Sequence, residues 1–172
     1  MKKMLARSIA EVVDGFYQGP LDLEVDGGCS FDSREISSGD VFLALKGDKT
    51  DGHEYIADAK RNGAVLAITT KSVDMPHIVV ADVLTAIARL ATHVRRELPA
   101  LKVVGITGSQ GKTTTKDILK TVLSRVGATV VARGSYNNEL GAPLTILNCN
   151  EDTKFCVVEM GARHTEIGRA HV

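Results

Sequence analysis

A glycine-rich turn that contains a lysine is the part of this 172-residue sequence best suited to chemistry. The turn reads Gly108-Ser109-Gln110-Gly111-Lys112-Thr113-Thr114. An apolar strand pattern over 102–107 precedes it and a helical pattern over about 112–126 follows, which is the context of a phosphate-binding loop. Closely spaced backbone N–H groups and a helix N-terminus both favour a bound anion. We therefore predict that this loop binds nucleotide phosphates, with Lys112 at the outer phosphates and the Thr113 hydroxyl facing Mg²⁺.

The spacing of this loop departs from the common Walker pattern G-x-x-x-x-G-K-[ST]. That pattern requires glycine at position 106, where the sequence has Ile106, and Gly105 lies one residue too early. The alternative interpretation is an ordinary strand-to-helix turn with a surface lysine. The strand, loop and helix together favour the phosphate loop.

An acidic residue at the end of another apolar strand supports this interpretation. Glu159 closes the run Phe155-Cys156-Val157-Val158. A buried carboxylate is costly unless it is paired or bound to a metal, and triphosphate sites need an acidic group near their magnesium ion. A glutamate that simply reaches solvent at the strand end is the alternative. Beside a phosphate loop, we predict that Glu159 and Thr113 bind the magnesium ion.

Alternating strand and helix patterns predict an α/β fold that positions these residues. A capping box at Ser8 and Glu11 predicts a first helix over about 8–14. A second helix is predicted over 54–62, and a third, capped by Asp82, ends before Pro99. Strands are predicted over 41–45, 64–69, 77–81, 102–107, 128–132 and 155–160. The helix after the loop is predicted to bury Ile118, Leu119, Val122, Leu123 and Val126.

Pro99-Ala100 is the predicted boundary between two domains. Residues 1–99 form a small α/β domain, and residues 100–172 form an incomplete parallel α/β domain of the phosphate-loop type. Lys plus Arg and Asp plus Glu both total 21, so the balance of charge gives no reason to expect nucleic acid or an anionic membrane as partner. The start is not a signal peptide, and no apolar run is long enough to span a membrane. Three scattered cysteines suit a reducing cytoplasm.

These motifs resemble the Mur ligase family, whose central domain carries a G-T-x-G-K-[ST] loop. Ser109 replaces the usual threonine and keeps its hydroxyl. The further segments 135–144 (SYNNELGAPL) and 158–162 (VEMGA) resemble the members that add D-alanyl-D-alanine to UDP-N-acetylmuramoyl-tripeptide. So do 31–34 (FDSR), 39–47 (GDVFLALKG) and 51–53 (DGH), and the resemblance extends from about residue 8 to 164.

The resemblance implies an ATP- and Mg²⁺-dependent, cytoplasmic ligase that is monomeric when full length and acts through an acyl phosphate. Residues 1–99 would hold the UDP-sugar substrate, with Ser33 and Arg34 at the uridine nucleotide. Asn137 and Asn138 would bridge the nucleotide and the sugar substrate. For Ser33 and Arg34, the open alternative is a capped turn with a surface arginine. For Asn137 and Asn138, it is that asparagine suits the backbone geometry of a turn. His53 is expected to make local hydrogen bonds rather than to catalyse.

The resemblance also implies that catalysis needs more than these residues. Family members carry a longer central domain, with a carbamylated lysine and adenine contacts, and a third domain that brings the amino-acid substrate. The 172-residue chain alone is therefore expected to be inactive. Within the enzyme class, the alternatives are a sister Mur ligase or a folylpolyglutamate synthase. Outside it, the alternative is a non-catalytic module that binds a nucleotide or a UDP-sugar.

Overall fold

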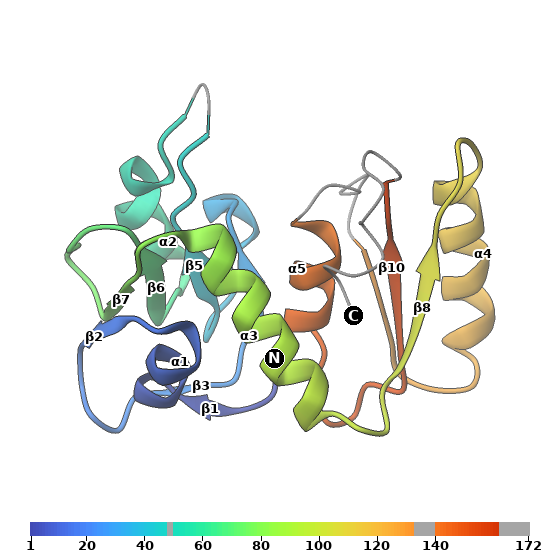
Figure 1. Ribbon diagram of the computed structural model, residues 1–172, viewed down its shortest axis with the longest axis horizontal. Coiled ribbons are helices and arrows are strands. Elements are labelled where there is room, and N and C mark those ends of the chain that lie inside the picture. The colour runs from blue at the N-terminus through green and yellow to red at the C-terminus, as the bar shows by residue number, and fades with distance from the viewer. Residues whose placement is uncertain (48–49, 133–139, 162–172) are drawn as a thin grey trace. The chain divides into compact units, whose positions relative to one another are not determined.

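Strands and helices alternate along most of the chain, so the predicted α/β fold is confirmed (Figure 1). The computed structural model describes residues 1–47, 50–132 and 140–161. It divides into two units, Met1–Leu90 and Ala91–Val172, and the division falls within helix α3 (Val83–Glu97) rather than after Pro99. No helix of the described residues is both long and apolar enough to cross a membrane.

A five-stranded sheet forms the centre of the first unit. Its order is β2-β7-β6-β5-β4, with β2 antiparallel to β7 and the other neighbours parallel. Val41, Phe42 and Leu43 on β5 are fully buried, as a central strand covered on both faces requires. The strands are β2 (Phe16–Gln18), β4 (Cys29–Ser30), β5 (Val41–Leu43), β6 (Leu66–Thr69) and β7 (His77–Val79).

Helices and short turns of helix surround this sheet. They are α1 (Ala6–Val13), the 3-10 turns η1 (Ser33–Glu35) and η2 (Gly52–Tyr55), α2 (Ile56–Asn62) and the start of α3. A separate antiparallel pair joins β1 (Met4–Leu5) to β3 (Glu24–Val25). Asp82 caps α3 as predicted, because its Oδ1 accepts a hydrogen bond of 2.7 Å from the Thr85 N–H.

The predicted capping box at Ser8 is wrong. Helix α1 begins at Ala6, after the extended residue Leu5, so Ser8 lies inside the helix. The Ala6 N–H instead donates to the Leu23 carbonyl at 2.9 Å. No side chain caps the start of α1, and this contact with a residue distant in sequence satisfies one of its N-terminal donors.

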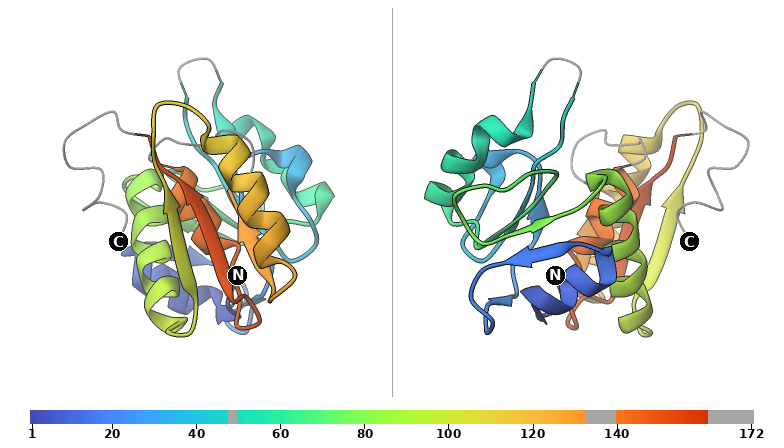
Figure 2. Two further views of the ribbon diagram at one scale, coloured as in Figure 1. Left: turned by 90° about the vertical axis from the view of Figure 1, so that its right-hand side faces the viewer. Right: turned by 60° about the vertical axis from the view of Figure 1, so that its left-hand side comes forward.

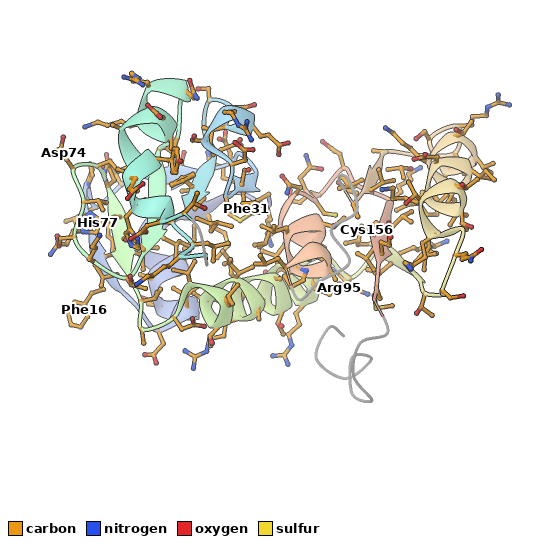
Figure 3. All side chains as sticks on the ribbon, turned by 90° about the horizontal axis from the view of Figure 1, so that it is seen from above. Phe16, Phe31, Asp74, His77, Arg95 and Cys156 are labelled. Atoms are coloured by element: carbon orange, nitrogen blue, oxygen red, sulfur yellow. The ribbon has the colours of Figure 1, made fainter. Side chains whose placement is uncertain are left out.

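The second unit is built on three parallel strands in the order β8-β10-β9. Helix α4 covers one face of this sheet and α5 lies on the other (Figure 2). The buried Cys156 side chain, on β10, lies inside this unit (Figure 3). The elements are β8 (Lys102–Ile106), α4 (Lys112–Leu123), β9 (Thr129–Val131), α5 (Gly141–Leu147) and β10 (Phe155–Glu159).

Part of the predicted core of α4 is exposed. Ile118, Val122 and Val126 are 59%, 54% and 64% exposed, so the prediction that they are buried is wrong. The stripe that contacts the sheet is the one with Lys116, Leu119 and Leu123, which are buried or half-buried. Helix α4 thus has a second apolar stripe, which the described residues leave exposed. Strand β8 is an edge of this sheet, and three of its five residues are exposed.

Candidate functional site

The glycine-rich turn lies between β8 and α4, as the sequence predicts. Gly111 is the residue before the helix and has the left-handed φ of 75°, which favours glycine. A Cβ at Gly111 would meet nothing within 4 Å, so conformation rather than space calls for glycine there. Gly108 also has a positive φ, of 148°. Both glycines therefore allow the chain to turn sharply at the carboxyl end of β8, where α4 begins.

Lys112 is the first residue of α4, and its side chain folds back over the turn. Its Nζ donates a hydrogen bond of 2.5 Å to the Gly108 carbonyl oxygen. Ser109, Gln110, Thr113 and Thr114 are exposed around it. The ammonium group and the N-terminus of α4 thus lie at the same end of the helix, where both favour an anion.

Glu159 ends β10 at the same level as the start of the turn. In the parallel register it is paired with Ile106, the last residue of β8. Its side chain is buried, with only 2% of the residue exposed, and Oε2 accepts no hydrogen bond from the described residues. The alternative of a solvated strand-end glutamate is therefore wrong for this structure. A buried carboxylate oxygen without a hydrogen bond is the kind of atom that binds a cation.

Lys116 is a buried residue of this site that the sequence prediction missed. It is 4% exposed, and its Nζ lies 3.8 Å from Oε2 of Glu159. Lys116 follows Lys112 by four residues, so the two lie on the same face of α4. The available signal was a lysine in register with Leu119 and Leu123 on the inward stripe of the helix.

The chemistry of these residues fits a magnesium ion. Mg²⁺ prefers oxygen ligands, and proteins commonly bind this ion through one or two carboxylates together with substrate phosphates. Glu159 supplies a carboxylate oxygen and Thr113 a hydroxyl. The described residues contain no group of three or more His, Cys, Asp or Glu side chains that could hold a metal, so a dedicated protein cage is not formed there. These residues therefore fit a magnesium ion that is also bound to a nucleotide.

In the first unit, Ser33 and Arg34 differ in accessibility. Ser33 lies in η1 and is buried, and its carbonyl accepts a hydrogen bond of 2.7 Å from the Asn62 side chain. The Arg34 side chain is 86% exposed and pairs with Asp32 through Nε at 2.9 Å and Nη2 at 2.6 Å. This guanidinium holds the pKa of Asp32 below its usual value. Arg34 is the more accessible of the two residues to a ligand.

Asp40 and His53 organise loops of the first unit. Asp40 is buried, and its carboxylate accepts hydrogen bonds from the N–H groups of Gly28 at 2.5 Å and Ser37 at 2.8 Å. The His53 Nδ1 contacts the Asp51 carboxylate, and Nε2 accepts from the Thr70 N–H at 3.4 Å. These are local hydrogen bonds, as expected for His53. Asn137 and Asn138 lie outside the described residues.

Two family models match the sequence of this chain. Residues 27–120 match the model described as "Mur ligase family, catalytic domain", and residues 106–171 match "Mur ligase middle domain". Similar curated proteins are the UDP-N-acetylmuramoyl-tripeptide–D-alanyl-D-alanine ligases of Mycobacterium tuberculosis and Escherichia coli. Sequence identity is 39% to the first and 35% to the second. The matches cover 95% and 91% of this chain, but only 38% and 34% of the length of these relatives. The chain therefore spans little more than a third of their length.

Solved structures give the same result. A structure of MurF from Acinetobacter baumannii has a TM-score of 0.79 at 36% identity, with 96% of this chain and 37% of that chain covered. MurF from Thermotoga maritima in complex with ADP has a TM-score of 0.63 at 36% identity, with 81% and 33% covered. The first family model alone covers more than half of the sequence. The chain therefore belongs to the Mur ligase family.

Proposed function

We propose that this chain is part of an ATP-dependent ligase that joins D-alanyl-D-alanine to UDP-N-acetylmuramoyl-tripeptide in peptidoglycan precursor synthesis. The names of the relatives from Mycobacterium tuberculosis and Escherichia coli state this activity. In this proposal residues 1–99 bind the UDP-sugar substrate, and residues 100–172 form the first part of the ATP-binding domain. Because the chain spans 38% and 34% of the length of those relatives, its function is best tested by binding rather than by turnover.

The observation that carries this proposal is the position of Glu159 beside the glycine-rich turn. Its buried Oε2 accepts no hydrogen bond from the described residues, and Glu159 is the register partner of the residue from which the turn begins. A phosphate-binding loop next to an unsatisfied buried carboxylate is the arrangement expected for a nucleotide bound with magnesium.

The proposed reaction has two steps. A carboxylate oxygen of the UDP-muramoyl-tripeptide attacks the γ-phosphorus of ATP, and the bond to the β–γ bridging oxygen breaks, which gives an acyl phosphate and ADP. The amine of D-alanyl-D-alanine then attacks the acyl carbon, loses a proton and displaces inorganic phosphate. Two anions must approach each other in the first step, so positive charge around the γ-phosphate lowers its barrier.

The residues of the second unit supply part of that charge. The Lys112 ammonium and the backbone N–H groups of the turn bind and orient the phosphates. Thr113 and Glu159 would hold the magnesium ion, which neutralises phosphate charge when it is bound. Ser109, Gln110 and Thr114 complete the wall of the loop. In the first unit, the exposed Arg34 guanidinium is suited to the diphosphate of the UDP-sugar. The buried Ser33 positions this turn.

We further place the enzyme in the cytoplasm. All three cysteines are buried and none forms a disulfide, and reduced thiols are typical of a reducing compartment. The nucleotide substrates of the proposed reaction are available there.

Calorimetry with ADP, with and without MgCl₂, tests the nucleotide part of this proposal on the 172-residue chain. We expect the affinity for ADP to be higher with magnesium and to fall at least about tenfold in Lys112→Met. No heat at millimolar ADP in the presence of magnesium would overturn the assignment of the loop. A parallel titration with UDP-N-acetylmuramate tests the first unit separately.

A further inference from the structure

The ion pair between Lys116 and Glu159 is poorly built for stability. Both residues are buried, at 4% and 2% exposed, yet Nζ and Oε2 are 3.8 Å apart, which is too far for a hydrogen bond. Removing two charges from water is costly, and their attraction offsets this cost only with good geometry and further hydrogen bonds. Oε2 accepts no hydrogen bond from the described residues. A pair selected for stability alone would be in direct contact.

The pair lies where a metal-bound nucleotide is proposed to bind. Lys116 is one helical turn after Lys112 on the same face of α4, and Glu159 is level with Ile106 at the start of the loop. The Lys116 ammonium is therefore close to the carboxylate that would bind magnesium. It is also buried, whereas Lys120, one turn further along the helix, is exposed.

We propose that Lys116 is a positioning residue that holds the Glu159 carboxylate in place before the metal–nucleotide complex binds and that opposes binding of a divalent ion alone. This inference rests on the proposed function, because it assigns Glu159 to magnesium. An ammonium 3.8 Å from Oε2 attracts the carboxylate and repels a second cation at the same oxygen. The phosphates of a nucleotide add negative charge that offsets this repulsion. Magnesium thus binds well only together with its nucleotide.

The first test measures thermal unfolding of the 172-residue chain with and without about 10 mM MgCl₂, at matched ionic strength. We expect the metal to raise the Tm of the wild type by less than about 1 °C, and that of Lys116→Met by roughly 3 °C or more. Lys116→Arg and the exposed control Lys120→Met should respond like the wild type. Adding Glu159→Gln to Lys116→Met should abolish the larger response of that variant. Equal responses in the wild type and Lys116→Met would overturn the proposal.

A double-mutant cycle tests whether the pair interacts. Removing one member of a buried ion pair takes away the counter-charge of the other, so Lys116→Met and Glu159→Gln should each lower the Tm by about 10 °C. The double variant K116M/E159Q buries no charge and should lose much less than the sum of the two. Additive losses would overturn the pairing. If Lys116→Met does not fold, recovery of folding in the double variant supports the pairing, and failure of both overturns it.

Nucleotide binding separates failure of this inference from failure of the proposed function. Calorimetry with ADP and magnesium on the wild type tests the proposed function, and absence of binding counts against it. The unfolding measurements contain no nucleotide, so they still decide the role of Lys116. Where ADP does bind, the nucleotide should raise the affinity for magnesium by a smaller factor in Lys116→Met than in the wild type. In Lys120→Met this factor should be unchanged.

Discussion

Glu159 and Ile106 are register partners in the neighbouring parallel strands β10 and β8. The carboxylate therefore leaves the sheet at the level where the chain turns into the glycine-rich loop. Side chains alternate between the faces of a strand, so a shift of this register by one residue would move Glu159 to the other face. The parallel pairing of these two strands, rather than any local sequence signal, brings the carboxylate to the loop.

The first prediction concerns the lysine at the start of α4. We expect Lys112→Met to weaken binding of magnesium–ADP by roughly 10- to 150-fold, because a charge-assisted hydrogen bond to phosphate contributes about 1.5–3 kcal/mol. The free energy of unfolding should change by less than about 1 kcal/mol, since the contact of Nζ with the Gly108 carbonyl is exposed. Calorimetry measures the affinity. Lys120→Met is the matched control, and an equal loss in both variants would contradict the prediction.

The conformation of Gly111 gives a second prediction. Gly111→Ala should lower the free energy of unfolding by about 1–2 kcal/mol, because an alanine at φ 75° is strained even though its Cβ meets nothing within 4 Å. Urea unfolding measures the change. Gly47→Ala is the control, since its Cβ would meet the Thr50 carbonyl at an ordinary 3.5 Å and its φ is not in the left-handed region. Equal stability of both variants and the wild type would refute the strain.

The cap of α3 predicts a dependence of stability on pH. Hydrogen bonds from the side chain and backbone N–H of Thr85 hold the pKa of Asp82 below its usual value. The stabilisation is therefore fully present above the unfolded-state pKa of about 3.9 and is lost as pH falls through the lower folded-state value. Asp82→Ala should cost about 1 kcal/mol at neutral pH, and this cost should shrink below pH ~4.

Asp82→Asn separates the charge from the cap. Asparagine also caps helices but does not titrate in this range, so the variant should keep most of the stability at neutral pH. Urea midpoints of the wild type and both variants across this range provide the measurement. A cost of Asp82→Ala that stays constant as pH falls would show that the carboxylate charge does not contribute.

Burial predicts that the thiols are unreactive in the folded chain. Burial raises the pKa of Cys29 to about 12, and contact with Cys149 together with burial raises that of Cys156. Contact with Cys156 lowers the pKa of Cys149, but this thiol is fully buried and out of reach of a reagent. The thiolate is the reactive form, so Ellman's reagent at mildly alkaline pH should detect essentially no thiol in the native chain. In denaturant it should detect all 3 cysteines. Rapid reaction of one thiol in the native chain would show that its surroundings open readily.

The accessibility of Arg34 gives the prediction for the first unit. Arg34→Ala should weaken binding of UDP-N-acetylmuramate about tenfold or more, because the guanidinium suits a diphosphate. Arg61→Ala is the control, since Arg61 is also exposed and pairs with a nearby aspartate, Asp58, as Arg34 pairs with Asp32. Calorimetry on the 172-residue chain measures both. Unchanged affinity in Arg34→Ala would remove this residue from the proposed substrate site.

Sequence patterns predicted the elements that depend on local signals. The strand that ends at Glu159 and the helix capped by Asp82 are confirmed, because an apolar run closed by a charge and a capping residue before a periodic segment are local features. Helix α5 was not predicted. Its sequence contains Gly141 and Pro143, which weaken a helical pattern, although proline is tolerated in the first turn. Burial of all seven of its residues stabilises this helix through tertiary packing.

Features that depend on distant contacts were not predictable. The contact between Lys116 and Glu159 joins residues far apart in sequence, so nothing near either one predicts the other. The apolar periodicity of α4 predicted the helix correctly, but periodicity does not show which apolar residues a sheet covers. Ile118 and Val122 are exposed although their spacing is typical of a buried face. The roles of Ser33, Arg34, Asn137 and Asn138 remain predictions.

The exposed stripe of Ile118, Val122 and Val126 has a consequence for the behaviour of this chain in concentrated solution. Adjacent apolar side chains on a surface attract one another between molecules. Electrostatic repulsion normally opposes such attraction, but the formal net charge here is zero at pH 7. We therefore expect low colloidal stability near neutral pH, with light scattering that rises with protein concentration. Moving the pH away from neutrality, or introducing an acidic residue at position 122, should keep the chain dispersed.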